Sequence, residues 1–155
     1  MLFAQFSLND NKYVISVNEI VEIIPYIKVN EVAKLPEYIA GIINYRGKAV
    51  PVIDLCQLLL KVACKNKLST RILIVQMENK GSTKLFGLLV ERATETIREE
   101  MSNFIAPVIT SSDTPYLGPV LAKQSDLITL IAIDGIMEKL DESLFYAEKT
   151  VSQSN

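Results

Sequence analysis

Four residues have side chains that could work in pairs as acids, nucleophiles or metal ligands: Asp54, Asp134, Cys56 and Cys64. The two aspartates could form a paired-carboxylate site. Each of them, however, precedes an apolar helical stretch, where aspartate typically caps the first turn. The two cysteines have no histidine or further cysteine nearby to complete a metal site. We therefore expect capping aspartates, ordinary thiols, no metal and no other cofactor.

The chain of 155 residues contains no histidine and no tryptophan. Histidine is the commonest general base and the commonest metal ligand, so a Ser-His-Asp triad or a Cys-His dyad cannot be built. The six glycines are scattered and form no phosphate-binding loop. A carboxylate-based hydrolase remains an alternative, although no spacing of acids points to one. The composition favours a protein without enzymatic activity.

The overall composition is that of one folded domain with a slightly acidic surface. The hydrophobic fraction is 49%, the formal net charge is -2 and the isoelectric point is about 5.2. No basic cluster suggests nucleic-acid binding, so an oligonucleotide-binding small β-barrel is a distant alternative. No apolar run approaches the ~20 residues of a membrane span. With only two cysteines, we expect a reduced, cytoplasmic protein without direct membrane insertion.

The stretch 39–55, IAGIINYRGKAVPVIDL, predicts a β-hairpin followed by a short helix. Two arms rich in Ile and Val flank a polar centre in which Gly47 can adopt a positive φ and permit a tight reversal. Pro51 cannot donate a ladder hydrogen bond, so its strand should lie at a sheet edge or carry a bulge. Asp54 would then cap the helix that starts with LCQLLL.

Further strands are predicted wherever β-branched and aromatic residues recur between turn signals. The segment 2–8 alternates and should have one buried face, and the polar segment 62–70 should be a boundary or a surface loop. A C-terminal helix should pack through Ile136, Met137, Leu140 and Leu144, which recur at helical spacing. The other expected strands are 13–17, 20–24, 71–77, 85–90, 116–122 and 127–133.

The two halves of the chain resemble each other. YVISVNEIVEII, which starts at Tyr13, aligns without gaps with FGLLVERATETI, which starts at Phe86. Two further matches follow in the same order: Tyr38-Ile39 and Gly41 with Tyr116-Leu117 and Gly118, and Ile53-Asp54 with Ile133-Asp134. The shared order predicts two related β units, and many short strands closed by turns favour small barrels over a sandwich.

These segments resemble the CheW family of chemotaxis coupling proteins over residues 2–140. The most specific part is LPEYIAGIINYRGKAVPVIDL, in which Tyr-Ile, Gly, Ile-Asn, Arg-Gly, Val-Pro-Val and Asp-Leu follow the family order. YVISVNEIVEII, FGLLVERATETI and LITLIAIDGI contribute the rest. The chain departs from the family pattern at Tyr45, where Leu is usual, at Cys56, where Arg is usual, and at Ala93, where larger apolar residues are common.

The resemblance implies a mainly β, CheW-like fold: two small SH3-like five-stranded β-barrel subdomains with short helices and a C-terminal helix. A single domain is expected over residues 1–146, with intertwined subdomains that change over near 61–70. A polar tail over 147–155 would follow.

The resemblance also implies a non-enzymatic adaptor that couples chemoreceptor cytoplasmic tips to a CheA-type histidine kinase in bacterial chemotaxis. The chemoreceptors are methyl-accepting chemotaxis proteins, and the kinase would be contacted through its regulatory domain, which has the same fold. Such an adaptor is cytoplasmic and is recruited to membrane-associated receptor arrays. The same role in a pilus or surface-motility chemosensory system is an alternative, and the kinase-contact residues remain unknown.

The expected receptor-binding residues surround a groove between the barrels. Arg46 is either a solvated turn residue or a fixed charge bonded to Glu22, and Asn44 should bond its own turn backbone. Gly41 either allows close approach of another backbone or marks a bulge. If its strand alternates, Glu22 shares one face with Ile20 and Ile24. The predicted set is Ile20, Glu22, Gly41, Asn44, Arg46 and Ala93.

Overall fold

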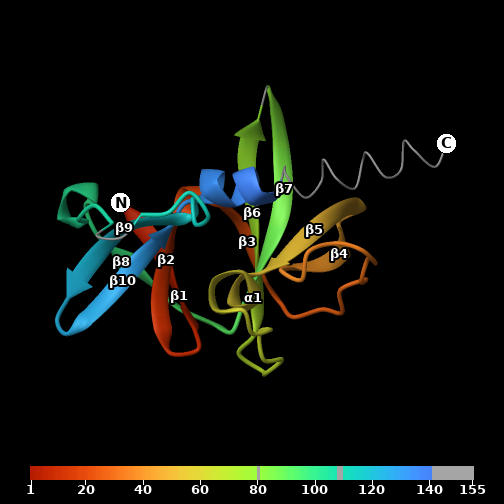
Figure 1. Cartoon of the computed structure of the whole chain (residues 1–155), viewed down its shortest axis with the longest axis horizontal. Helices are drawn as coiled ribbons and strands as arrows, with labels where there is room; N and C mark the ends of the chain where they lie inside the picture. Colours follow the sequence, from red (N-terminus) through yellow and green to blue (C-terminus); the bar gives the residue numbers. More distant parts are fainter. Residues whose placement is uncertain (80, 108–109, 141–155) are drawn as a thin grey trace.

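The computed structural model describes residues 1–79, 81–107 and 110–140 of the chain. The described strands form two five-stranded sheets that lie side by side (Figure 1). The first sheet consists of β1 (Leu2–Leu8), β2 (Asn11–Ser16), β8 (Arg92–Arg98), β9 (Leu117–Lys123) and β10 (Asp126–Ile131). The second consists of β3 (Ile20–Pro25), β4 (Ile39–Tyr45), β5 (Lys48–Asp54), β6 (Arg71–Asn79) and β7 (Ser82–Val90). The expected mainly β class is confirmed.

Short helical segments connect and cover the sheets. They are η1 (Val17–Glu19), α1 (Leu55–Leu60), η2 (Met101–Asn103) and a helical segment over residues 133–140. The last segment lies above the junction between the two sheets (Figure 1). The predicted tail over 147–155 lies outside the described residues, as does the domain end at 146.

Both sheets have the same strand order, and each borrows two strands from the other half of the chain. The orders are β8-β1-β2-β10-β9 and β3-β6-β7-β5-β4. In each sheet one central pair is parallel, β2 with β10 and β5 with β7, whereas the other pairs are antiparallel. The predicted repeat therefore corresponds to two five-strand units that exchange their first hairpins, which makes the subdomains intertwined.

The chain crosses between the sheets within the two segments that the sequence alignment matched. β2 leads through η1 into β3 of the second sheet, and β7 leads through Glu91 into β8 of the first. Residues 61–70 separate the two repeats along the chain, but they connect α1 to β6 within the second sheet. The spatial changeovers thus lie at 17–19 and at Glu91 rather than near 61–70.

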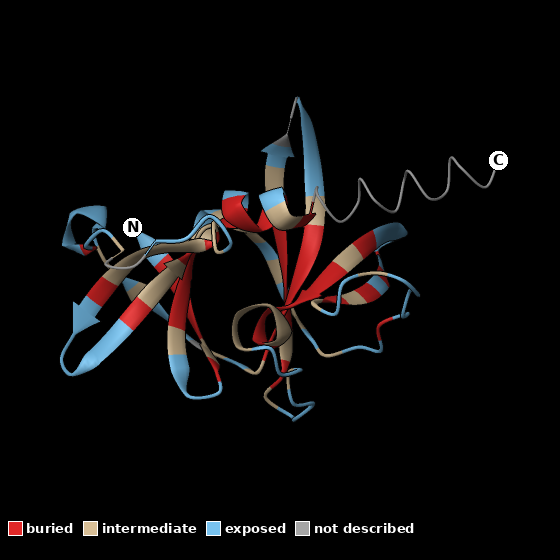
Figure 2. Ribbon diagram, in the orientation of Figure 1, coloured by how far each residue is buried: buried red, intermediate tan, exposed pale blue. Residues whose placement is uncertain are grey.

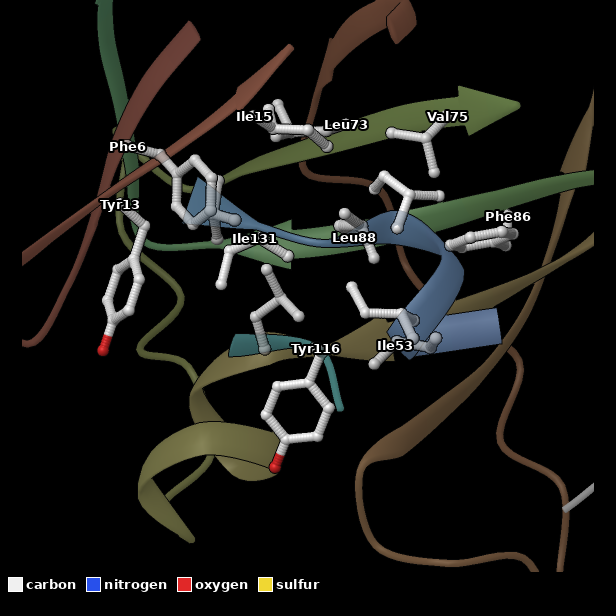
Figure 3. Close-up of a cluster of buried hydrophobic side chains, with 14 of the residues drawn as sticks. Phe6, Tyr13, Ile15, Ile53, Leu73, Val75, Phe86, Leu88, Tyr116 and Ile131 are labelled. Carbon is white, nitrogen blue, oxygen red and sulfur yellow. The ribbon is translucent and has the colours of Figure 1, made fainter. Parts of the chain in front are cut away.

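Three apolar clusters make up the core (Figure 2). The first-sheet cluster consists of Phe3, Val14, Phe104, Leu121 and Ile128. The second-sheet cluster consists of Val29, Ile43, Tyr45, Val50, Val52, Ile72, Ile74 and Leu89. The largest, which we call the interface cluster, joins both sheets to the helical segment 133–140; Figure 3 labels ten of its members: Phe6, Tyr13, Ile15, Ile53, Leu73, Val75, Phe86, Leu88, Tyr116 and Ile131.

Several strands are buried on both faces because they separate a sheet's own cluster from the interface cluster. In β6, Ile72 and Ile74 belong to the second-sheet cluster, whereas the intervening Leu73 belongs to the interface cluster. The prediction of one buried face for residues 2–8 is wrong for the same reason. Gln5, expected to be outside, is only 7% exposed, and its amide donates to Glu95. Strands covered on both sides read as continuous apolar runs.

Pro51 does not place β5 at a sheet edge, since β5 lies between β4 and β7. The parallel ladder to β7 involves only Val52, Ile53 and Asp54, so Pro51 precedes it and has no partner strand on that side. The ladder between β4 and β5 is irregular between Ile39 and Gly41. Pro51 is therefore compatible with this internal strand, because no neighbouring strand needs a hydrogen bond from residue 51 on the β7 side.

The two aspartates have different roles from each other. Asp54 is the N-cap of α1, and its Oδ1 accepts the backbone N–H of Gln57 at 3.0 Å, as predicted. Asp134 lies inside the first turn of the segment 133–140 and accepts the adjacent N–H of Gly135, so it is not the cap. Of the predicted helix face, Ile136, Met137 and Leu140 are buried, and Leu144 lies outside the described residues.

Candidate functional site

The β4–β5 turn positions the side chain of Arg46. Tyr45 pairs with Lys48, so the connection has two residues, and both have positive φ: 51° for Arg46 and 84° for Gly47. This combination gives the tight hairpin turn whose twist matches that of the flanking strands. Asn44 Oδ1 accepts the backbone N–H of Gly47 at 2.9 Å, which confirms its predicted role as a turn residue.

Glu22 of β3 receives two donors from this turn. Arg46 Nη2 lies 3.1 Å from Glu22 Oε2 and 3.4 Å from Oε1, and the Tyr45 hydroxyl donates to Oε2 at 2.5 Å. The hydrogen bond to Glu22 raises the pKa of the Tyr45 hydroxyl above its ordinary value. The Arg46 guanidinium carbon also lies 5.3 Å from the centre of the Tyr45 ring. The predicted bond between Arg46 and Glu22 is therefore present.

These contacts join the two edge strands of the second sheet through side chains. β3 and β4 are the ends of that sheet and share no ladder within the described residues. The Arg46 side chain remains 72% exposed and that of Glu22 36% exposed, so an exposed ion pair of this kind contributes at most about 1 kcal/mol to stability. The fixed guanidinium is nevertheless available to a partner molecule.

Ile20 does not share a face with Glu22 and Ile24. The pairing of β3 with β6 shifts between Ile20 and Glu22, which leaves Val21 as an extra residue. A bulge of this kind changes the alternation of faces along the strand. Ile20 accordingly packs against the interface cluster, while Ile24 packs against the second-sheet cluster.

The two edge strands leave apolar side chains exposed that the sequence did not single out. Val21 is 43% exposed, Ile23 is 45% exposed, and Ile42 of β4 is 36% exposed. Their types gave no signal, because β3 and β4 are edge strands only through the tertiary pairing of the sheet. Ile23 follows Glu22 in a regularly paired part of β3, so these two side chains lie on opposite faces of the strand. We call the exposed side chains of the two edge strands, Val21, Ile23, Ile42 and the Glu22–Arg46 pair, the β3–β4 surface.

Gly41 is approached closely by the chain itself. A Cβ added to Gly41 would lie 2.1 Å from the carbonyl oxygen of Asn30, and its φ is 147°. Asn30 and Ile42 exchange two backbone hydrogen bonds of 2.9 Å. The sequence predicted either a close approach of another backbone to Gly41 or a bulge at this position. Both are found, because the ladder between β4 and β5 is also irregular between Ile39 and Gly41. Gly41 and Asn44 lie on opposite faces of β4, one buried and one exposed.

Ala93 lies in the other sheet. It pairs with Phe6 of β1, is half-buried and packs against the interface cluster. The structure therefore brings Glu22, Asn44 and Arg46 together at one end of β4. Ile20 and Ala93 reach the interface cluster from opposite sheets.

Comparison with known proteins assigns this fold of two intertwined sheets, with its β4–β5 hairpin, to a family. The sequence model of the CheW-like domain matches residues 3–141. The chain belongs to the CheW family.

Individual relatives of the CheW family support this assignment. The chain is 32% identical over 139 residues to a chemotaxis protein CheW of Helicobacter pylori, covering 88% of this chain and 81% of that protein. It is 29% identical over 136 residues to a chemotaxis protein CheW of Bacillus subtilis, covering 86% and 85%. The crystal structure of the scaffolding protein TtCheW from Thermoanaerobacter tengcongensis superposes with a TM-score of 0.74 at 27% identity, covering 84% and 83%.

The CheW-like chain also contains a group of possible metal ligands that sequence reasoning separated. Asp54, Cys56 and Cys64 have ligand atoms that all lie within 4.8 Å of one another. The backbone N–H of Cys64 donates to Asp54 Oδ2 at 3.0 Å, and its thiol donates to the Leu89 carbonyl at 3.5 Å. Both cysteines are free thiols. Contact with Cys56, burial and contact with Asp54, in that order, raise the pKa of the Cys64 thiol far above its ordinary value.

This CheW-like structure, over the residues described, includes no helix with the length and apolar character needed to cross a membrane.

Proposed function

We propose that this chain is a non-enzymatic adaptor that couples the cytoplasmic tips of chemoreceptors to a CheA-type histidine kinase. The observation that carries the proposal is the match of the CheW-like domain to residues 3–141, which is nearly the whole chain. The relatives are named as chemotaxis proteins, and the similar solved structure is named as a scaffolding protein. An adaptor acts by holding two partners, so it needs two binding surfaces and no reactive group.

The proposed receptor-binding surface is the β3–β4 surface. A receptor tip is a helical hairpin, and an apolar helix face binds most readily to a groove that offers apolar area and a few fixed polar groups. Val21 and Ile23 supply exposed apolar area. Arg46, held by Glu22, supplies an oriented charge.

The other predicted residues contribute to this proposal in different ways. Asn44 fixes the turn that carries Arg46. Gly41 lets residue 30 pair with β4 and so shapes the strand, without itself reaching solvent. Ile20 and Ala93 pack against the interface cluster from the two sheets. The receptor-binding set remains Ile20, Glu22, Gly41, Asn44, Arg46 and Ala93.

The kinase would bind elsewhere, on apolar strand surface away from Arg46. Its regulatory domain is expected to have the same fold, so two similar sheets could pack through similar edges. Leu127 of β10 is 68% exposed and Ile105, which bridges to β9, is 52% exposed. The first sheet therefore offers apolar area that the receptor site does not use.

The test is a pair of titrations with folded Arg46→Glu protein, one against a receptor cytoplasmic fragment and one against a CheA-type kinase. We expect receptor binding to weaken at least about tenfold, or about 1.4 kcal/mol, because two acids then face each other. Kinase binding should stay nearly unchanged. Lys48→Glu is the matched control, since it reverses a charge on the same turn and has no contact with Glu22 among the described side chains.

Three outcomes would contradict this assignment. Equal loss for both partners would mean that Arg46 only maintains the fold. No loss for either partner would make it a solvated turn residue. Binding of neither partner by the unaltered chain would overturn the adaptor function itself.

A further inference from the structure

The group formed by Asp54, Cys56 and Cys64 has the composition of a metal site. Its three members come from one short stretch of chain: the N-cap of α1, the first turn of α1 and the loop that follows. Their ligand atoms lie within 4.8 Å of one another, and no other such trio occurs in the parts of the chain that the structure describes. Two thiols and a carboxylate are ligands that zinc accepts.

Asp54 is a buried acid whose carboxylate has hydrogen-bond donors and no positively charged partner among the described side chains. The residue is 6% exposed. Its oxygens accept backbone N–H groups from Gln57 and Cys64, which fix its orientation. The ion pairs among the described side chains join Lys12 with Asp126, Arg46 with Glu22 and Lys123 with Glu99, so none of them gives Asp54 a cationic partner. Burying a charge is costly unless it is paired, so a bound cation would relieve this cost.

A cleft gives solvent access to this group. It has a volume of about 600 Å³, and its lining includes Asp54, Cys64 and Gln57 together with the acids Glu31 and Glu37. Cys56, by contrast, is 2% exposed. The cleft thus joins two further acids with the Asp54 carboxylate and the Cys64 thiol in one lining.

We propose that Asp54, Cys56 and Cys64 bind one divalent transition-metal ion of the zinc class. A tetrahedral zinc ion has bonds of about 2.3 Å to sulfur and about 2.0 Å to oxygen, so its ligand atoms lie roughly 3.5–4 Å apart. The three atoms lie within 4.8 Å of one another, so no pair is more than about 1 Å farther apart than this arrangement requires. Water from the cleft would occupy the fourth position.

Binding would follow a balanced exchange. The ion forms two metal–sulfur bonds and one metal–oxygen bond, and the two thiols release two protons to solvent. Thiolate ligands select zinc-class metals over calcium and magnesium, which prefer oxygen. The bound ion would cross-link the loop 61–70 to α1, because Cys64 belongs to that loop and Cys56 to the helix.

The experiment is a titration of the full chain with Co²⁺, a spectroscopic substitute for zinc. The protein is first treated with a chelator and then kept reduced by a phosphine, which avoids competing thiols. We expect one equivalent of Co²⁺ to bind with a sulfur-to-cobalt charge-transfer band, and Zn²⁺ to displace it. At metal concentrations of about 100 times Kd, Tm should rise by about 5–10 °C.

Cys56→Ser and Cys64→Ser should each abolish the charge-transfer band. Asp54→Asn should weaken binding and still cap α1, because asparagine is also a good N-cap. Glu37→Gln is the matched control: it removes an acid from the same cleft without removing a ligand, and the band should persist.

Cobalt that binds without a sulfur band, or equally well to both cysteine variants, would show that only surface carboxylates hold it and would overturn the site. An absence of binding to the folded, reduced, unaltered chain would overturn it as well. This last measurement needs no variant, so it stands even if a substitution prevents folding. None of these results depends on the receptor or kinase proposals.

Discussion

The two sheets share one backbone plan but close their edges with different chemistry. In the second sheet, Ile42 of edge strand β4 exchanges two backbone hydrogen bonds with Asn30. At the equivalent position of the first sheet, Val120 of edge strand β9 exchanges two with Ile105. The hairpin turns also correspond, since Arg46 and Gln124 both have positive φ, 51° and 56°. The repeated backbone is therefore preserved down to individual bridges.

The side chains around these turns differ. Glu22 binds Tyr45 and Arg46, whereas the aligned Glu95 accepts from Gln5 within the first sheet. Lys123 occupies the position in the first sheet that Tyr45 occupies in the second, and it forms an ion pair with Glu99. The pKa of the Glu99 carboxyl is lowered chiefly by the hydrogen bond from the Asn103 amide and further by Lys123. A duplicated fold thus provides two equivalent edges. Only the second edge presents a fixed arginine on a carboxylate and a tyrosine.

The glycines of the edge strands offer the largest test of this equivalence. A Cβ on Gly41 would lie 2.1 Å from the Asn30 carbonyl oxygen at a φ of 147°, whereas a Cβ on Gly118 of β9, which lies one position before the equivalent of Gly41, would lie 2.9 Å from the Leu130 carbonyl oxygen. We expect Gly41→Ala to cost about 3–5 kcal/mol and Gly118→Ala about 1–2 kcal/mol, since only the first adds backbone strain to the clash. Chemical denaturation of both variants measures the difference, and equal costs would contradict it.

The interface cluster should make the two sheets unfold together. Leu140 is 2% exposed in this cluster, so Leu140→Ala should lower the free energy of unfolding by about 2–4 kcal/mol in a single transition. Leu127→Ala, at a leucine that is 68% exposed, is the control and should change it by less than about 0.5 kcal/mol. Two separate transitions, or a loss below about half a kilocalorie for Leu140→Ala, would show that the helical segment does not hold the sheets together.

The receptor site should respond only to changes at the second turn. Arg46→Glu alone is expected to weaken receptor binding about tenfold, and Glu22→Arg combined with Arg46→Glu should recover most of that loss by restoring the attraction. Gln124→Glu, at the equivalent turn of the first sheet, should leave receptor affinity unchanged. Titrations of the three variants against one receptor fragment measure these affinities. A similar loss of affinity for Gln124→Glu would mean that the receptor contacts the edges of both sheets.

The smallest expected effect is that of salt on kinase binding. If the kinase binds apolar strand surface, its affinity should change less than about threefold between about 50 and 500 mM salt. Receptor binding should change more if it involves the Arg46–Glu22 pair as proposed. Loss of kinase binding at high salt would show that this surface is electrostatic as well.

The sequence alone determined the β class, the repeat, the 45–48 turn and the cap of α1. It could do so because these features depend on local rules: strand patterns, turn glycines and capping aspartates. The family pattern of residues 36–55 likewise pointed to Asn44 and Arg46, and the apolar stretch 20–24 pointed to Glu22; the structure brings the three together. The ion pair could be anticipated because an acid within an apolar strand needs a partner.

Only the tertiary structure decided which strands share a sheet, because the exchange of hairpins depends on contacts between residues far apart in sequence. It also decided the bulge at Val21, which turns Ile20 away from Glu22, and the edge position of β3, on which Val21 and Ile23 are exposed. The grouping of Asp54, Cys56 and Cys64 was missed for a similar reason. Spacing gave Asp54 a capping role, and only the return of the loop 61–70 onto α1 brings the Cys64 thiol to the same carboxylate.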